Sequence, residues 1–114
     1  MNLLIAEDDP SNRIILFLLM EYWGYNSDIV SNGKEAVILA KANEGQYDLC
    51  IMDLDMPIMN GCKAAATIHR QQINLPILAI TANDEYKQTY KNNGIDGILE
   101  KPYKPDALYA KIKK

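Results

Sequence analysis

Short apolar runs alternate with helical segments five times along this chain, and this alternation restricts the fold more than any other feature. The predicted strands are 3–6, 25–30, 48–53, 76–80 and 98–100, and the predicted helices are 10–23, 34–43, 62–71, 84–93 and 106–114. A repeated strand–helix order gives a parallel sheet with helices on both faces. The sequence therefore predicts an α/β fold in which five helices flank a five-stranded parallel sheet. Few apolar residues occur in 84–93, so we expect weak packing of this helix.

The overall composition is that of an ordinary globular domain. The 114 residues fit one domain that covers residues 1–114. A net charge of -3 argues weakly against nucleic-acid binding. No apolar run approaches the roughly 18 residues that cross a bilayer, and no charged signal-peptide start is present. Cys50 and Cys62 do not indicate a disulfide framework. We therefore expect a cytoplasmic protein with no membrane or nucleic-acid partner.

Asp53 ends the third predicted strand, directly after an apolar run. Leu49–Met52 is apolar throughout, and a loop with Pro57 and Asn60–Gly61 follows. An apolar run bounded by turn residues is typical of a strand buried on both faces. Ligands of open parallel sheets bind at the carboxyl ends of the strands. The sequence therefore predicts that Asp53 lies at the mouth of a binding site.

Polar residues follow three more strands, at Asp8–Asp9, Thr81 and Lys101. Converging carboxylates repel one another and need a cation, and hard oxygen ligands in a wet site favour Mg²⁺. A nucleophilic aspartate can accept a phosphoryl group. Mg²⁺, Lys101, and the Thr81 hydroxyl with the backbone N–H of Ala82 can each neutralise one phosphoryl oxygen. The set therefore predicts phosphoryl transfer to Asp53.

Taken singly, each of these residues has a commoner structural role. Asp8–Asp9 before Pro10 is typical of a helix N-cap. Thr81 alone is typical of a side-chain turn, and Lys101 alone of a solvated surface. The combination on four strand ends favours the functional interpretation.

With these motifs, the chain resembles the receiver domain of response regulators in two-component signalling. The resemblance extends over the whole chain and is carried by Ile5–Pro10, Asp48–Pro57 with Asn60–Gly61, Ile80–Ala82 and Glu100–Tyr103. It implies a flavodoxin-like doubly wound sheet with strand order 2-1-3-4-5. It also implies a cis peptide bond between Lys101 and Pro102, which is chemically accessible before proline.

The resemblance further implies a phosphorylation-dependent switch that catalyses only its own phosphorylation and dephosphorylation. Asp53 accepts the phosphoryl group from a phosphohistidine of a sensor histidine kinase or a histidine phosphotransfer protein. The implied Mg²⁺ ligands are the side chains of Asp9 and Asp53 and the backbone carbonyl of Asp55, with Asp8 acting through water. The arriving phosphoryl group then shifts the surface of the fourth helix and fifth strand.

Two residues depart from the family pattern. Ile98 stands three positions before Lys101, where the family often has an aromatic residue that turns inward with the threonine. A rotating aromatic side chain therefore cannot report phosphorylation here. Asp55, two residues after Asp53, adds negative charge at the rim of the site. This charge predicts tighter Mg²⁺ association and altered phosphorylation or dephosphorylation rates.

The first predicted helix contains seven consecutive apolar residues, Ile14–Met20, although a core-facing helix needs only one apolar stripe. This run indicates either a broad core face or an outer face that docks a partner helix. The family resemblance favours docking of the kinase or phosphotransfer protein there. The oligomeric state is not readable from the sequence, and a phosphorylation-linked dimer is one possibility.

Two other function classes remain open at this stage. Asp53-Leu54-Asp55 also resembles the Asp-x-Asp motif of haloacid-dehalogenase-type phosphatases. The chain could also be a receiver-like interaction module that works without phosphorylation. Turnover of a phosphomonoester would indicate the phosphatase, and a stoichiometric phosphoryl-aspartate would indicate the switch.

Overall fold

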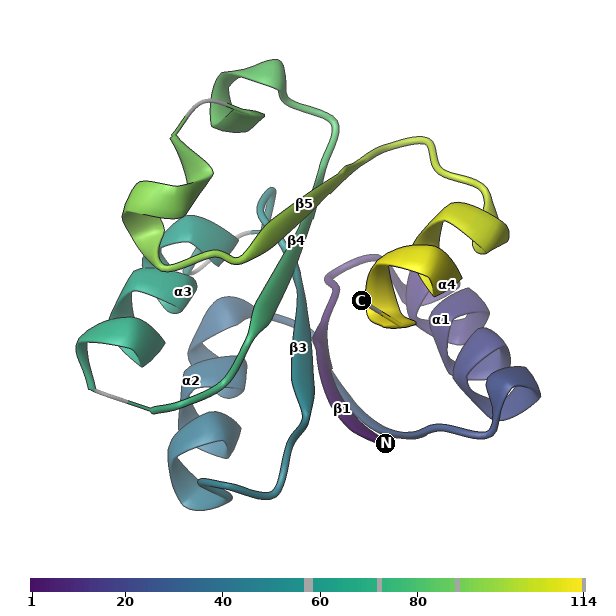
Figure 1. Cartoon of the computed structure of the whole chain (residues 1–114), viewed down its shortest axis with the longest axis horizontal. Coiled ribbons are helices and arrows are strands. Elements are labelled where there is room, and N and C mark those ends of the chain that lie inside the picture. The colour runs from purple at the N-terminus through teal and green to yellow at the C-terminus, as the bar shows by residue number, and fades with distance from the viewer. Residues whose placement is uncertain (57–58, 72, 88, 114) are drawn as a thin grey trace.

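A five-stranded parallel sheet forms the centre of the computed structural model (Figure 1). The described residues are 1–56, 59–71, 73–87 and 89–113. The strands are β1 (Asn2–Ala6), β2 (Asn26–Val30), β3 (Leu49–Asp53), β4 (Ile77–Thr81) and β5 (Gly97–Glu100). Their spatial order is β2-β1-β3-β4-β5, which confirms the order implied by the family resemblance.

Helices cover both faces of this sheet. On one face lie α1 (Pro10–Trp23) and α4 (Pro105–Lys113), and on the other lie α2 (Gly33–Ala42) and α3 (Gly61–Arg70) (Figure 1). Because side chains of a strand alternate between faces, each helical layer has its own core. The core beneath α1 and α4 contains Leu3, Ile5, Leu16, Met20, Ile51, Leu78, Ile80, Leu108 and Ile112. The core beneath α2 and α3 includes Leu4, Ala6, Ala36, Cys50, Met52, Ala64, Ala65 and Ile68.

Local sequence signals set the ends of α1. The Asp9 side chain accepts a hydrogen bond from the backbone N–H of Ser11 at 2.9 Å and caps the helix. Pro10 occupies the first turn, where its missing N–H costs nothing. Gly24 ends the helix with φ 77°, in the left-handed region that favours glycine. The helix therefore runs from Pro10 to Trp23, as the sequence predicts.

The prediction of an α-helix at 84–93 is wrong. In the described residues, this region contains two short 3₁₀ helices, η1 (Asp84–Lys87) and η2 (Tyr90–Asn93), which leaves four α-helices instead of five. Neither 3₁₀ helix contains a buried residue. Helices in proteins gain most of their stability by packing an apolar face, and this polar segment has almost none.

One peptide bond, the two cysteines and the lengths of the helices complete the description of the fold. The Lys101–Pro102 peptide bond is cis, as the family resemblance implies. Cys50 is buried in β3 and Cys62 is partly buried in α3, and both are free thiols. None of the helices in the described residues combines the length and apolar character needed to cross a membrane.

Gly61 allows the loop after β3 to return close to the strand end. A Cβ at this position would overlap the carbonyl oxygen of Asp53 and lie 2.7 Å from the Cα of Leu54. Both neighbours are backbone atoms, so the strand end itself would have to move. Close backbone approach therefore requires glycine at the start of α3.

We predict that Gly61→Ala lowers the free energy of unfolding by about 1–3 kcal/mol, because overpacking displaces the backbone. Urea denaturation monitored by circular dichroism measures the change. Gly97→Ala is the matched control, since its added Cβ would meet only the Leu78 Cδ1 atom at an ordinary 3.6 Å. Equal stability of the two variants would contradict the steric explanation.

Candidate functional site: an acidic group and a lysine at the sheet edge

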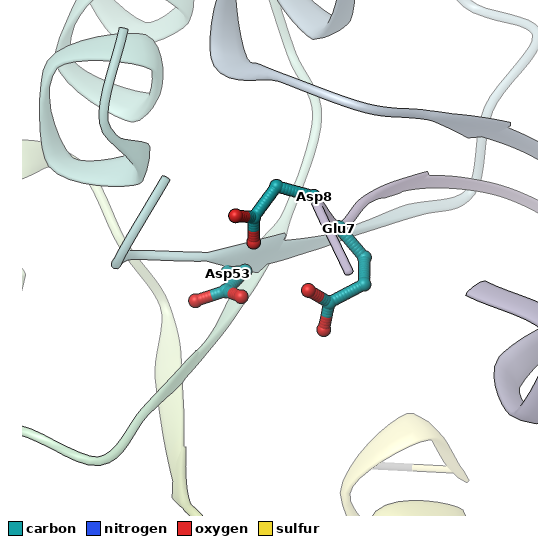
Figure 2. A group of neighbouring side chains, drawn as sticks. All are labelled: Glu7, Asp8 and Asp53. Atoms are coloured by element: carbon teal, nitrogen blue, oxygen red, sulfur yellow. The ribbon is translucent and has the colours of Figure 1, made fainter. Parts of the chain in front are cut away.

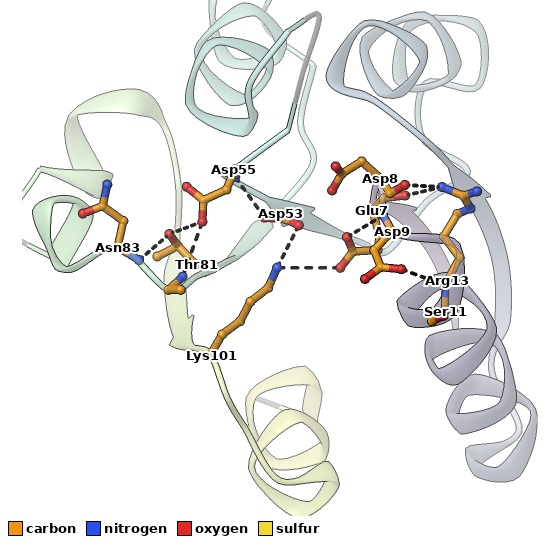
Figure 3. A network of polar contacts seen from close by, with 11 residues as sticks. Glu7, Asp8, Asp9, Ser11, Arg13, Asp53, Asp55, Thr81, Asn83 and Lys101 are labelled. Atoms are coloured by element: carbon orange, nitrogen blue, oxygen red, sulfur yellow. Dashed lines mark hydrogen bonds and ion pairs between the residues drawn. The ribbon is translucent and has the colours of Figure 1, made fainter.

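The carboxyl ends of four strands bring the predicted site residues together (Figure 3). Glu7 and Asp8 follow β1, Asp53 ends β3, Thr81 ends β4 and Lys101 follows β5. Parallel pairing aligns these ends: Asp53 lies beside Ile80, and Thr81 lies beside Glu100. Asp53 is 3% exposed and Thr81 is 1% exposed. Two polar side chains are thus buried at the edge of the core, where they require partners.

Lys101 supplies the positive charge of the site. Its Nζ donates a hydrogen bond to Oδ2 of Asp53 at 2.9 Å and lies 3.8 Å from Oε1 of Glu7. Burial alone would lower the pKa of Lys101, but the hydrogen bond and negative charge of Asp53 outweigh this effect and raise the pKa. The ammonium group is therefore charged and neutralises the buried Asp53 carboxylate.

Three carboxyl groups form an acidic group beside this lysine. Glu7, Asp8 and Asp53 each offer an oxygen, and these oxygens lie within 4.8 Å of one another (Figure 2). The pKa of Glu7 is raised to about 7. Burial is the main cause, the hydrogen bond from the backbone N–H of Asp9 opposes it, and the neighbouring Asp53 adds to it. Like charges at this separation are relieved by a proton or by a cation. A set of hard oxygen donors suits Mg²⁺.

Asp9 lies outside the acidic group, which differs from the expectation that its side chain is a metal ligand. Its carboxylate caps α1 through the N–H of Ser11 and is exposed. Glu7 takes the place in the acidic group that the sequence interpretation gave to Asp9. The sequence contained a signal for this assignment: Asp9 directly precedes Pro10, and a side chain that caps a helix folds back over the first turn.

Arg13 is a second residue that the sequence interpretation did not include. Its guanidinium donates hydrogen bonds to the backbone carbonyls of Glu7 at 3.0 Å and Asp8 at 2.9 Å. These bonds come from the first turn of α1 and hold the loop that carries both acidic side chains. The sequence does not predict that Arg13 binds these backbone carbonyls, because an arginine in a helix is usually solvated.

Asp55 faces the opposite side of the site from the acidic group (Figure 3). Its backbone N–H donates to Oδ1 of Asp53 at 2.9 Å. Its side-chain Oδ2 accepts hydrogen bonds from the hydroxyl of Thr81 at 2.9 Å and from the N–H of Ala82 at 3.4 Å. The N–H of Asn83 donates to the Thr81 oxygen at 3.0 Å. The predicted phosphoryl-binding donors are thus near Asp53 and are bound to Asp55.

Ile98 and Tyr103 lie on opposite faces of the sheet. Ile98 is half-buried in β5 and packs against the core beneath α2 and α3. Tyr103 packs against the core beneath α1 and α4, and burial is the main cause of the raised pKa of its hydroxyl. The position that is often aromatic in the family is therefore a packed aliphatic residue here.

The sequence model of the family described as "Response regulator receiver domain" matches residues 3–113. Among curated relatives, Two-component response regulator 24 of Arabidopsis thaliana is 38% identical over 101 residues, which are 87% of this chain and 72% of that protein. The aerobic respiration control sensor protein ArcB of Escherichia coli (strain K12) is 35% identical over 118 residues. That match spans 100% of this chain but only 15% of the sensor protein.

Solved receiver structures have the same fold. The receiver domain of sensor histidine kinase PA1611 from Pseudomonas aeruginosa, with a magnesium ion coordinated in its active-site cleft, matches with a TM-score of 0.89 and 28% identity, over 98% of this chain and 93% of that chain. A co-crystal of the Saccharomyces cerevisiae histidine phosphotransfer protein Ypd1 with the receiver domain of Ssk1 matches with a TM-score of 0.89 and 31% identity, over 99% and 86%. The family match and the strand order together show that this chain belongs to the response regulator receiver domain family of two-component signalling.

Proposed function

We propose that the chain is a phosphorylation-dependent switch, with Asp53 as the phosphoacceptor and residues 1–114 acting as one receiver domain. The observation that carries this proposal is the buried Asp53 carboxylate, which accepts a hydrogen bond from the Lys101 ammonium group and lies beside the carboxyl groups of Glu7 and Asp8. An anionic nucleophile next to a lysine and a site suited to Mg²⁺ can attack phosphorus, and the two cations would then stabilise the transferred group. The proposed chemistry is confined to phosphorylation and dephosphorylation of Asp53. A cytoplasmic location stays a prediction.

The proposed transfer makes one bond and breaks one bond. A carboxylate oxygen of Asp53 bonds to phosphorus, the phosphorus–nitrogen bond of the donor phosphohistidine breaks, and the imidazole nitrogen keeps that electron pair. Lys101 neutralises charge on the phosphoryl oxygens from one side. The Thr81 hydroxyl and the Ala82 N–H are donors for another oxygen. Positioning and charge neutralisation therefore provide most of the proposed catalysis.

Mg²⁺ is the proposed cofactor, and it supplies charge neutralisation at the phosphoryl oxygens when bound. The proposed ligands are Glu7, Asp8 and Asp53, because their carboxyl oxygens lie together, with the backbone carbonyl of Asp55 as a further ligand. Glu7 and Asp8 would hold the metal together with Asp53, Asp8 through water. Support also comes from the PA1611 receiver domain, which has a magnesium ion in its active-site cleft.

A sensor histidine kinase or a histidine phosphotransfer protein is the proposed partner, docked on α1. The outer side of this helix exposes five large apolar residues: Ile14, Ile15, Phe17, Leu18 and Tyr22. Ile15 also lines a groove with Lys101 and Tyr103, so the apolar surface continues to the edge of the site. The complex of Ypd1 with the Ssk1 receiver domain supports a partner of this kind.

The proposed output surface is the edge formed by β5 and the two 3₁₀ helices. The backbone N–H of Lys101 donates to the carbonyl oxygen of Thr81 at 2.9 Å, which connects the site to the end of β5. Lys87 of η1 pairs with Glu100 of β5 at 2.6 Å and with Asp84 at 3.3 Å. A movement of Thr81 therefore reaches a surface that is held by exposed ion pairs, which are individually weak.

We predict that incubation with phosphoramidate and Mg²⁺ adds one phosphoryl group to the chain, because the site supplies both nucleophile and countercharge. Intact-protein mass spectrometry measures the gain. Asp53→Asn and chelation with EDTA should each abolish it. A gain that persists in Asp53→Asn would contradict the assignment of the acceptor. Catalytic release of phosphate from a phosphomonoester would instead favour the phosphatase alternative.

We predict that Mg²⁺ affinity rises about tenfold between pH 6 and pH 8, because Mg²⁺ competes with the proton that Glu7 holds below its raised pKa of about 7. Isothermal titration calorimetry measures the dissociation constant. Glu7→Gln should bind Mg²⁺ more weakly and lose most of this pH dependence.

Asp9→Asn is the matched control for this experiment, because asparagine caps a helix as well as aspartate does. Mg²⁺ affinity close to that of the unchanged chain is expected for Asp9→Asn. A large loss in Asp9→Asn, with none in Glu7→Gln, would reverse the proposed ligand assignment.

We predict that Leu18→Glu slows phosphoryl transfer from a phosphorylated histidine phosphotransfer protein at least tenfold, because charge on the apolar face disrupts docking. The rate with phosphoramidate should stay the same, because this small donor needs no docking surface. Ile38→Glu is the matched control: Ile38 is 56% exposed and lies on α2, across the sheet. Equal slowing with both donors would contradict docking on α1.

A further inference from the structure

The Thr81 hydroxyl already donates its hydrogen bond to a carboxylate of this chain. A threonine hydroxyl has one proton and can donate to one acceptor at a time. Here it donates to Oδ2 of Asp55 at 2.9 Å, while the N–H of Asn83 donates to the same hydroxyl oxygen. The bond from Asn83 occupies a lone pair of the hydroxyl. The proton of the hydroxyl is therefore directed at Asp55.

Ala82 adds a second donor to the same oxygen. Its backbone N–H lies 3.4 Å from Oδ2 of Asp55, so the same carboxylate oxygen accepts from two donors at the end of β4. Asp55 is anchored at its other end, because its backbone N–H donates to Oδ1 of Asp53. The backbone of Asp55 is therefore held next to the proposed phosphoacceptor, and its carboxylate lies beside Thr81.

We propose that Asp55 is a positioning residue whose carboxylate acts as an internal anion. It binds the Thr81 hydroxyl and the Ala82 N–H, and it must release both when Asp53 is phosphorylated. This inference rests on the proposed function, which assigns the same two donors to a phosphoryl oxygen. The two anions compete for a single hydroxyl proton, so they cannot both bind Thr81. Asp55 therefore lowers the rate of phosphoryl acceptance and keeps Thr81 in place until Asp53 is phosphorylated.

Electrostatics determine the outcome of this competition. A phosphoryl group brings negative charge next to Asp55, and like charges in a partly buried site repel each other. Asp55 is exposed, so its carboxylate can move into water at small cost once the hydroxyl turns to phosphorus. Before phosphorylation, the same carboxylate lowers the rate in two ways, by occupying the donors and by repelling an anionic phosphodonor.

The rate of phosphorylation by phosphoramidate tests this proposal. Asp55→Ala should raise the rate about tenfold, since a hydrogen bond to a charged acceptor is lost. Asp55→Asn should give an intermediate rate, because its amide oxygen still accepts from Thr81 but carries no charge. Glu85→Gln removes an exposed carboxylate at the same edge without touching Thr81, and it should leave the rate unchanged.

A double-mutant cycle separates competition for Thr81 from a general charge effect. In a Thr81→Ala background, Asp55→Ala should accelerate phosphorylation much less than it does alone, because no hydroxyl remains to be freed. The same acceleration with and without Thr81 would overturn the proposal. So would an unchanged or lower rate in Asp55→Ala, and a lower rate would assign the Asp55 charge to Mg²⁺ binding.

The position of the Ala82 amide gives a readout that does not depend on activity. In the unphosphorylated chain, Asp55→Ala should shift the Ala82 and Asn83 amide resonances, while Glu85→Gln should leave them in place. Unshifted resonances in Asp55→Ala would also overturn the proposal. Failure of the unchanged chain to accept any phosphoryl group would instead count against the proposed function itself.

Discussion

The ion pair between Lys101 and Asp53 is the interaction on which the rest of the site depends. A carboxylate that is 3% exposed needs a countercharge, because an unpaired buried charge is strongly destabilising. Lys101 reaches Asp53 from the end of β5, two strands away across β4. The sheet order thus makes the pair possible, and the pair connects the two strand ends.

Around this pair, the site divides into two halves with different needs. On one side, Glu7 and Asp8 add negative charge beside Asp53, which favours a proton or a divalent cation. On the other side, the donors of Thr81 and Ala82 need an anion, and Asp55 provides one. Asp53 accepts hydrogen bonds from the Asp55 N–H through Oδ1 and from Lys101 through Oδ2, and it lies beside Glu7 and Asp8, so a change on one side of the site can affect the other.

The helix α1 serves both the fold and the proposed docking. Leu16 and Met20 fill the core beneath it, and Arg13 fixes the backbone of Glu7 and Asp8. Its outer face exposes the large apolar side chains of Ile14, Ile15, Phe17 and Leu18, and Tyr22 is 85% exposed. Because the same helix carries the proposed docking face and anchors the loop of Glu7 and Asp8, a partner bound to α1 would be positioned close to Asp53, the proposed acceptor.

The sequence by itself determined the order of the strands along the chain, the position of Asp53 at the end of a buried strand and the set of strand ends that form the site, since these follow from periodicity and parallel pairing. The adjacent Pro10 already indicated that Asp9 caps α1. Only the tertiary structure decided that Glu7 joins Asp8 and Asp53 in the acidic group, and that Asp55 turns toward Thr81. It also decided that 84–93 forms two 3₁₀ helices. Adjacent residues of one chemical type could each occupy a given position in the site. Which of them does so depends on backbone direction and on contacts from distant strands, which local sequence does not encode.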